Sequence, residues 1–156
     1  MSKSTRRVER AAAAAGLDMS VLHMPASTRT AQEAAAACAC DVGQIVKSMI
    51  FEGVDSGELK LLLVSGRHDV NLDAASGMFD EGLRRADPGR VREETGFAIG
   101  GVAPIGHLSA IDTWMDNALL QYPAVWAAAG APNAVFRVAP DALLRATGAR
   151  VFHNGA

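Results

Sequence analysis

The sequence predicts a mixed α/β (α+β) fold, in which helices surround a mixed, largely antiparallel sheet that curls toward a barrel. Apolar segments of strand length and helix-forming segments follow one another without a regular βαβ repeat. Residues 53–58 carry the Gly, Asp and Ser residues of a turn between two apolar segments, which predicts a hairpin. With 156 residues, of which 49% are hydrophobic, the chain is long enough for one domain with a buried core, expected over residues 1–156.

The helices are predicted from their end signals. Gly16 and Gly148 are typical residues after a helix C-terminus, and Thr30 with Glu33 has the spacing of a capping box. Asp87 and Pro88 introduce another helix. The expected helices cover residues 4–15, 30–40, 71–78, 89–94, 117–121 and 140–147.

The strands are predicted from short apolar segments bounded by Gly, Pro, Asn or Asp. Pro25 closes the first of them. The expected strands cover residues 21–24, 44–52, 59–65, 111–115, 124–129, 135–138 and 150–152.

The formal net charge of −2 provides no overall positive field that would recruit nucleic acid, so a nucleic-acid contact must rest on a few local basic residues. Cys38 and Cys40 are too close in a helix to bridge easily, and no further ligands stand near them, so we expect neither a disulfide nor a metal site. Unpaired thiols and the lack of a signal peptide or long apolar span favour a cytoplasmic protein without membrane contact. No cofactor motif is present.

Residues 96–107 form the most informative segment, because four glycines and a proline occur among residues that are otherwise apolar. Such a segment is either a tight connection between strands or a pocket wall built from main-chain amides. Its apolar residues are unusual for a solvent loop and favour the pocket wall.

Lys47 is the leading candidate side chain. Strand alternation places it on one face with Ile45, Met49 and Phe51. A lysine in that position either extends along a sheet edge into solvent or points into a pocket. Next to the glycine-rich segment the pocket is favoured, where an ammonium group can bind a phosphate, a ribose hydroxyl or a developing oxyanion.

Other catalytic signals are weak. The four histidines show no metal-ligand spacing, and each is expected at the surface or at a strand end, with His107 kept as a candidate for the pocket rim. Asp116 either caps the following helix or faces the pocket. Serine-nucleophile motifs, a Walker A sequence and the dinucleotide-binding glycine pattern are all missing.

In their order, these segments resemble the YbaK/prolyl-tRNA-synthetase-associated family of aminoacyl-tRNA editing deacylases, over roughly residues 28–144. The matching segments are the helix start at 28–35, the strand with its lysine at 44–48, the segment 66–72, the Gly-Pro loop at 95–106, the element 115–119 and the residues 129–133. Asn117 stands where many members carry Glu.

The resemblance implies hydrolysis of the ester that links a mischarged amino acid to the terminal adenosine of a tRNA, most often tRNA-Pro. It implies catalytic roles for Lys47, Gly100, Gly101 and Val102. Substrate binding is expected from Thr30, Ile45, Ser48, Met49, Pro104 and Asp116. Met78 and Phe79 are further candidates for the pocket wall, whose apolar character predicts a small amino acid such as Ala, Ser, Thr or Cys.

The expected partners are the acceptor end of an aminoacyl-tRNA and an aminoacyl-tRNA synthetase. Two alternatives stay open. The same pocket would also serve a module that binds tRNA or a synthetase without hydrolysis, or a sensor of small molecules.

Overall fold

The computed structural model describes residues 2–154 and confirms the mixed α/β fold. The helices within this range are α1 (Lys3–Ala14), α2 (Ala31–Cys38), α3 (Leu72–Phe79), α4 (Pro88–Thr95) and α5 (Pro140–Thr147), with 3₁₀ helices η1 (Val42–Gln44) and η2 (Asn117–Gln121). The strands are β1 (Val21–His23), β2 (Ile45–Gly53), β3 (Leu59–Ser65), β4 (Leu83–Arg85), β5 (Asp112–Asp116), β6 (Val125–Ala128), β7 (Ala134–Val138) and β8 (Arg150–Phe152). No helix in this part of the chain has the length and apolar character needed to cross a membrane.

The strands form one mixed sheet in the order β1-β7-β6-β2-β3-β5-β8, and β4 pairs with the far end of β2. The ladders β1·β7, β2·β3, β2·β4 and β6·β7 are antiparallel, and β2·β6, β3·β5 and β5·β8 are parallel. The expected curl toward a barrel is wrong. The sheet stays open because its path ends in two strands of three residues each, β1 and β8, which do not pair with each other.

Most predicted elements lie within two residues of their expected bounds, and the capping box of Thr30 and Glu33 is present. The predicted helix at 117–121 is the 3₁₀ helix η2. Strand β4 was not predicted, because it has three residues, two of them exposed arginines, and therefore no apolar alternation.

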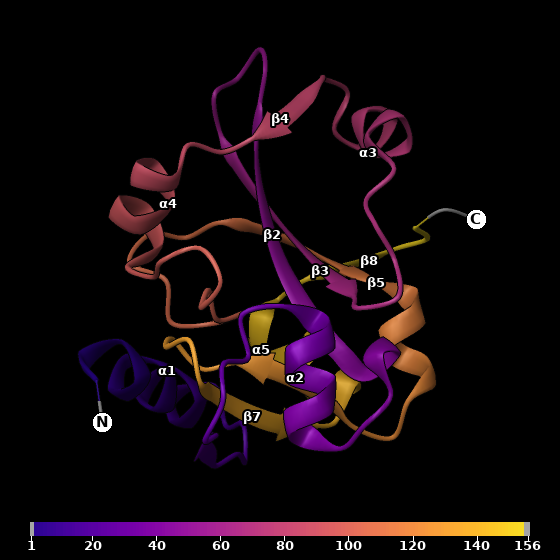
Figure 1. Ribbon diagram of the computed structural model, residues 1–156. Coiled ribbons are helices and arrows are strands. Elements are labelled where there is room, and N and C mark those ends of the chain that lie inside the picture. The colour runs from indigo at the N-terminus through magenta and orange to yellow at the C-terminus, as the bar shows by residue number, and fades with distance from the viewer. Residues whose placement is uncertain (1, 155–156) are drawn as a thin grey trace.

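The two faces of β2 are covered differently. On one face, Ile45 packs beneath α2, whereas Met49 and Phe51 belong to a cluster beneath α3. Lys47 lies between these two clusters, on a part of the strand that neither helix covers. Figure 1 shows the long β2–β3 hairpin running from the level of α2 toward α3 and β4.

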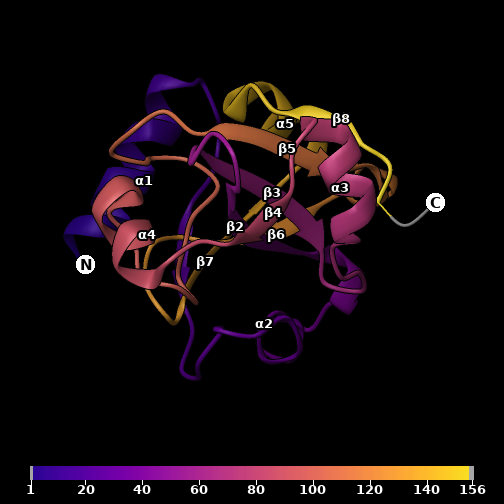
Figure 2. The same ribbon diagram turned by 90° about the horizontal axis from the view of Figure 1, so that it is seen from above.

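On the other face of β2, Val46 and Ile50 pack into the main core, which also contains Phe97, Phe136 and Leu143. Seen from above, α2 and α5 lie on opposite sides of the strands (Figure 2). The sheet therefore separates the main core from the side on which α2 and Lys47 lie.

Candidate functional site

A cavity of about 520 Å³ lies beside the first half of β2. Its walls come from segments far apart in the sequence. They are residues 28–32 and Ala34 around the start of α2, residues 45–48 of β2, residues 66–69 after β3, residues 99, 100 and 102 of the glycine-rich loop, and residues 126–128 and 135 of β6 and β7. The structure therefore contains a pocket as predicted, and both Lys47 and the glycine-rich loop line it.

A gap in the sheet opens into this cavity. The β2·β6 ladder ends at Val46↔Ala127, and on the same edge the β2·β4 ladder begins at Phe51↔Arg85, preceded by a bond from Ala86 N–H to Ile50 O. Because alternate residues of a strand direct their main-chain groups to the same edge, Ser48 presents its N–H and C=O to this gap. Within residues 2–154 no strand lies opposite Ser48, and Ser48 lines the cavity.

The Lys47 ammonium group is held at the cavity wall by the segment after β3. Its Nζ donates to the carbonyl oxygen of His68 and lies 3.6 Å from Asp69 Oδ1. The Lys47 side chain is 25% exposed, whereas Asp69 is completely exposed, so solvent screens this ion pair and it contributes little. The positive charge of Lys47 therefore remains available to an anionic group in the cavity.

The glycine-rich loop offers main-chain donors to the cavity. Gly100 has a φ of 92°, and among the described residues neither its N–H nor that of Val102 donates a hydrogen bond. Gly101 differs, because its N–H donates to Ala98 O and the residue does not line the cavity. Gly100 and Val102, together with Ile99, are thus residues of this loop that line the cavity and whose N–H groups have no partner among the described residues.

Both ends of the loop are fixed by polar contacts. Arg7 donates to Gly106 O at 2.7 Å and to Thr95 O at 3.3 Å, and its guanidinium lies over the Phe97 ring. His107 Nε2 lies 2.7 Å from Ala103 O, and burial, followed by the nearby charge of Arg7, lowers the pKa of His107. The amides of the loop are therefore held in place before any ligand binds.

A histidine and a buried aspartate lie next to the lysine. Nδ1 of His68 is 3.0 Å from Oδ2 of Asp116, and the Asp116 side chain has no exposed surface. The same carboxylate accepts the N–H of Ser65 at 3.1 Å and, through Oδ1, the N–H of Ala118 at 3.0 Å. The capping interpretation of Asp116 is thus observed, and Asp116 reaches the cavity through the His68 ring.

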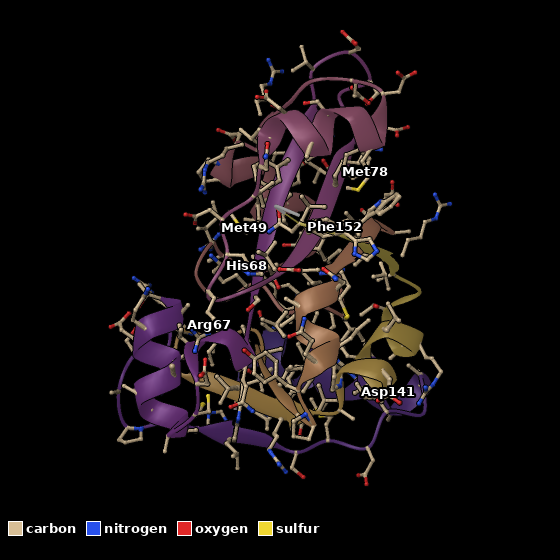
Figure 3. All side chains as sticks on the ribbon, turned by 90° about the vertical axis from the view of Figure 1, so that its right-hand side faces the viewer. Met49, Arg67, His68, Met78, Asp141 and Phe152 are labelled. Carbon is tan, nitrogen blue, oxygen red and sulfur yellow. The ribbon has the colours of Figure 1, made fainter. Side chains whose placement is uncertain are left out.

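Six of the predicted site residues meet at the cavity. Those that line it are Thr30, Ile45, Lys47, Ser48, Gly100 and Val102. Those that do not line it are Met49, Gly101, Pro104 and Asp116, together with Met78 and Phe79. Figure 3 shows why the two methionines lie outside the cavity. Met49 and Met78 lie together with Phe152 below α3, whereas the cavity residues Arg67 and His68 lie toward α2. Pro104 is buried, and together with His107, the candidate for the pocket rim, it lines a separate hollow and not the cavity.

The sequence interpretation missed His68 and the two arginines of the cavity, Arg29 and Arg67. Arg67 forms a two-pronged contact with Asp41, with Nε–Oδ1 and Nη2–Oδ1 distances of 3.0 and 2.7 Å. This hydrogen-bonded pairing lowers the pKa of Asp41 and raises that of Arg67. The side chain of Arg29 is exposed and lies across Gly100. The described residues contain no cluster of three His, Cys, Asp or Glu side chains suited to a metal ion.

Known proteins are similar to this chain in sequence and in fold. A crystal structure of a protein proposed to be a trans-editing enzyme for prolyl-tRNA synthetase is 48% identical to the chain, with a TM-score of 0.92 and coverage of 99% of this chain and 98% of that one. YwhH of Bacillus subtilis, an uncharacterised protein, is 27% identical over 123 residues, which make up 79% of this chain and 78% of YwhH. Proline–tRNA ligase of Thermosipho melanesiensis is 32% identical over 87 residues, which are 55% of this chain and 15% of the ligase. The aminoacyl-tRNA editing domain family matches residues 25–146, and the chain therefore belongs to that family.

Proposed function

We propose that the protein is a trans-acting aminoacyl-tRNA deacylase, which hydrolyses the ester between a wrongly attached small amino acid and the terminal adenosine of tRNA-Pro. The observation that carries this proposal is the cavity, whose walls carry both Lys47 and the residues Ser48, Gly100 and Val102, whose main-chain N–H groups have no partner among the described residues. Membership of the editing-domain family and the similarity to a prolyl-tRNA ligase support the reaction class and the tRNA.

The groups in the cavity suit the hydrolysis of an activated ester. An aminoacyl ester needs a positioned water and stabilisation of the oxyanion, and it does not require a nucleophilic side chain. Lys47 and the amides of Gly100 and Val102 would stabilise the negative charge that develops on the carbonyl oxygen. Gly101, whose amide is already bonded to Ala98, would contribute the shape of the turn.

The size of the accepted amino acid would be set by apolar walls. Ile45, Val102 and Trp126 line the cavity, and hydrophobic pockets of this kind discriminate by about 1–3 kcal/mol per methylene group. We therefore expect alanyl, seryl, threonyl or cysteinyl esters to be removed, and lysyl or glutamyl esters to remain.

The partner would be the acceptor end of the aminoacyl-tRNA. Arg29 is exposed beside Gly100 and would contact a phosphate near the terminal adenosine. The similarity to a prolyl-tRNA ligase supports a prolyl-tRNA synthetase as a second partner.

The test is a deacylation assay on tRNA-Pro charged in turn with alanine, serine, threonine, cysteine and proline, and on lysyl-tRNA. Lys47→Ala should lower kcat/KM on the best substrate by about a hundredfold, because one stabilising charge is lost from the transition state. Lys3→Ala is the matched control, since Lys3 is exposed on α1 away from the cavity. Binding of charged tRNA without turnover of any ester would favour a non-catalytic binding module instead.

A further inference from the structure

We propose that His68 is a catalytic residue that transfers the proton in this hydrolysis, and that Asp116 is its positioning residue. The inference rests on the proposed deacylase function and adds a general base and acid to it. Its starting point is the chain of contacts in which the buried Asp116 carboxylate holds the His68 ring, while the His68 carbonyl holds the Lys47 ammonium group.

The contact to Asp116 determines which nitrogen of His68 is available. A carboxylate can only accept a hydrogen bond, so the neutral His68 ring carries its proton on Nδ1 and donates it to Asp116 Oδ2. Nε2 then has a free lone pair, and the described residues provide no hydrogen-bond partner for it. Nε2 is therefore the atom of this side chain that can take a proton.

The different exposure of His68 and Asp116 indicates that His68 Nε2 is accessible from the cavity. The His68 side chain is 40% exposed and the residue lines the cavity, whereas Asp116 has no exposed surface. Because Nδ1 faces the buried carboxylate, Nε2 lies on the side of the ring away from Asp116. Asp116 is in turn fixed by the N–H groups of Ser65 and Ala118, so the ring is held by a carboxylate that cannot turn away.

The reaction then balances with water as the only co-reactant. His68 Nε2 takes a proton from a water molecule as the water oxygen bonds to the ester carbonyl carbon. The resulting oxyanion is stabilised by Lys47 and by the loop amides. When the bond between this carbon and the ribose oxygen breaks, the imidazolium returns its proton to the ribose oxygen, and an amino acid and a free tRNA end are released.

The rate should rise with pH, because Nε2 can take a proton from water only while the His68 ring is neutral. The charged groups that surround the ring are Asp116 on its buried side, Lys47 at its own carbonyl, and its chain neighbours Arg67 and Asp69. Lys47 has the opposite dependence, because it acts only while it is protonated. A rising limb that disappears when His68 is replaced therefore identifies the histidine.

The test compares His68→Ala, His68→Gln and Asp116→Asn with the wild-type protein, and His153→Ala, an exposed histidine outside the cavity, is the matched control. We expect both His68 variants to lose about 10²–10⁴ in single-turnover kcat on the best mischarged tRNA, with KM little changed. We also expect the rising limb of the pH profile to vanish, and added imidazole to restore part of the rate in His68→Ala. His153→Ala should retain the wild-type rate and profile.

Two results separate the inference from the proposed function. If the wild-type protein deacylates but His68→Gln keeps its rate and its rising pH limb, the role of His68 is refuted and the deacylase proposal stands. If the wild-type protein hydrolyses none of the esters, the proposed function itself fails. Melting temperatures are measured for every variant, and His68→Gln, which leaves the contacts of Asp116 to Ser65 and Ala118 in place, decides the matter if Asp116→Asn proves unstable.

Discussion

Replacing Gly100 by alanine tests the conformation of the glycine-rich loop. The same substitution at the neighbouring residue, Gly101→Ala, provides the control. Gly100 has a φ of 92°, in the region that L-residues avoid, whereas Gly101 does not have a positive φ. A Cβ atom on Gly101 would meet the Ala131 main chain at 3.4 Å, an ordinary contact. A Cβ atom on Gly100 would meet the flexible Arg29 side chain at 3.3 Å, so the backbone and not the space decides the outcome.

The two substitutions are expected to change the free energy of unfolding differently. A left-handed backbone costs an alanine about 1–2 kcal/mol, and the lower entropy of the unfolded chain offsets about 0.4–1 kcal/mol of this. Gly100→Ala should therefore lower the free energy of unfolding by about 1 kcal/mol, which is about 2–4 °C in Tm for a chain of this size. Gly101→Ala carries only the second effect, so it should leave Tm unchanged or raise it slightly.

The two variants are compared by differential scanning calorimetry and by deacylation of mischarged tRNA. Gly100→Ala should also slow deacylation, because the strain is relieved by turning the free N–H groups of Gly100 and Val102. Gly101→Ala should keep most of the activity. If Gly101→Ala is the more damaging substitution in either assay, the assignment of the free amides to Gly100 and Val102 is refuted.

Three further predictions follow from individual side chains. Burial lowers the pKa of His107 below its usual value of 6.5, so the unfolded chain binds the proton more readily than the folded protein. The stability contributed by His107 is therefore lost as pH falls below 6.5. Over this pH range Tm should drop less for His107→Asn than for the wild type, and an equal drop would contradict the prediction. Ser48 Oγ is buried without a partner in the described residues, so Ser48→Ala should raise Tm by about 2–4 °C. Deacylation should persist, because it is the main chain of Ser48 that faces the cavity. A lower Tm together with lost activity would show that the hydroxyl is needed. Arg29→Ala should raise KM for charged tRNA and weaken its salt dependence without changing kcat, whereas Arg145→Ala on α5 should do neither.

The sequence predicted the elements that carry strong local signals. The capping box at Thr30 and the hairpin at 53–58 depend on residues within a few positions of one another, and both are present. The openness of the sheet could not be predicted, because it depends on whether two distant short strands, β1 and β8, meet. Strand β4 exists only because the far end of β2 offers it a partner.

The site was predicted in part for the same reason. Lys47 and the glycine-rich loop are local patterns, and both line the cavity. Alternation correctly placed Met49 on the face of Lys47, but a helix that could not be positioned from the sequence, α3, covers that part of the face. His68 was missed because its partner Asp116 is 48 residues away in the sequence. The sequence shows a histidine after one strand and an aspartate at the end of another, but it does not show that the two side chains meet.

In the proposed deacylase, the gap between β6 and β4, the two partners on one edge of β2, would divide substrate recognition between main-chain and side-chain groups. The polar atoms at Ser48 belong to the main chain, so nearly every substitution at that position leaves them in place. They suit the ammonium and carboxyl-derived groups that all aminoacyl esters share. The surrounding side chains come from α2, the loop and β6, which can change in size without disturbing the strand. For the proposed deacylase, a few substitutions in the cavity wall should therefore change which amino acid is accepted, while Lys47 and the main-chain groups at the cavity stay unchanged.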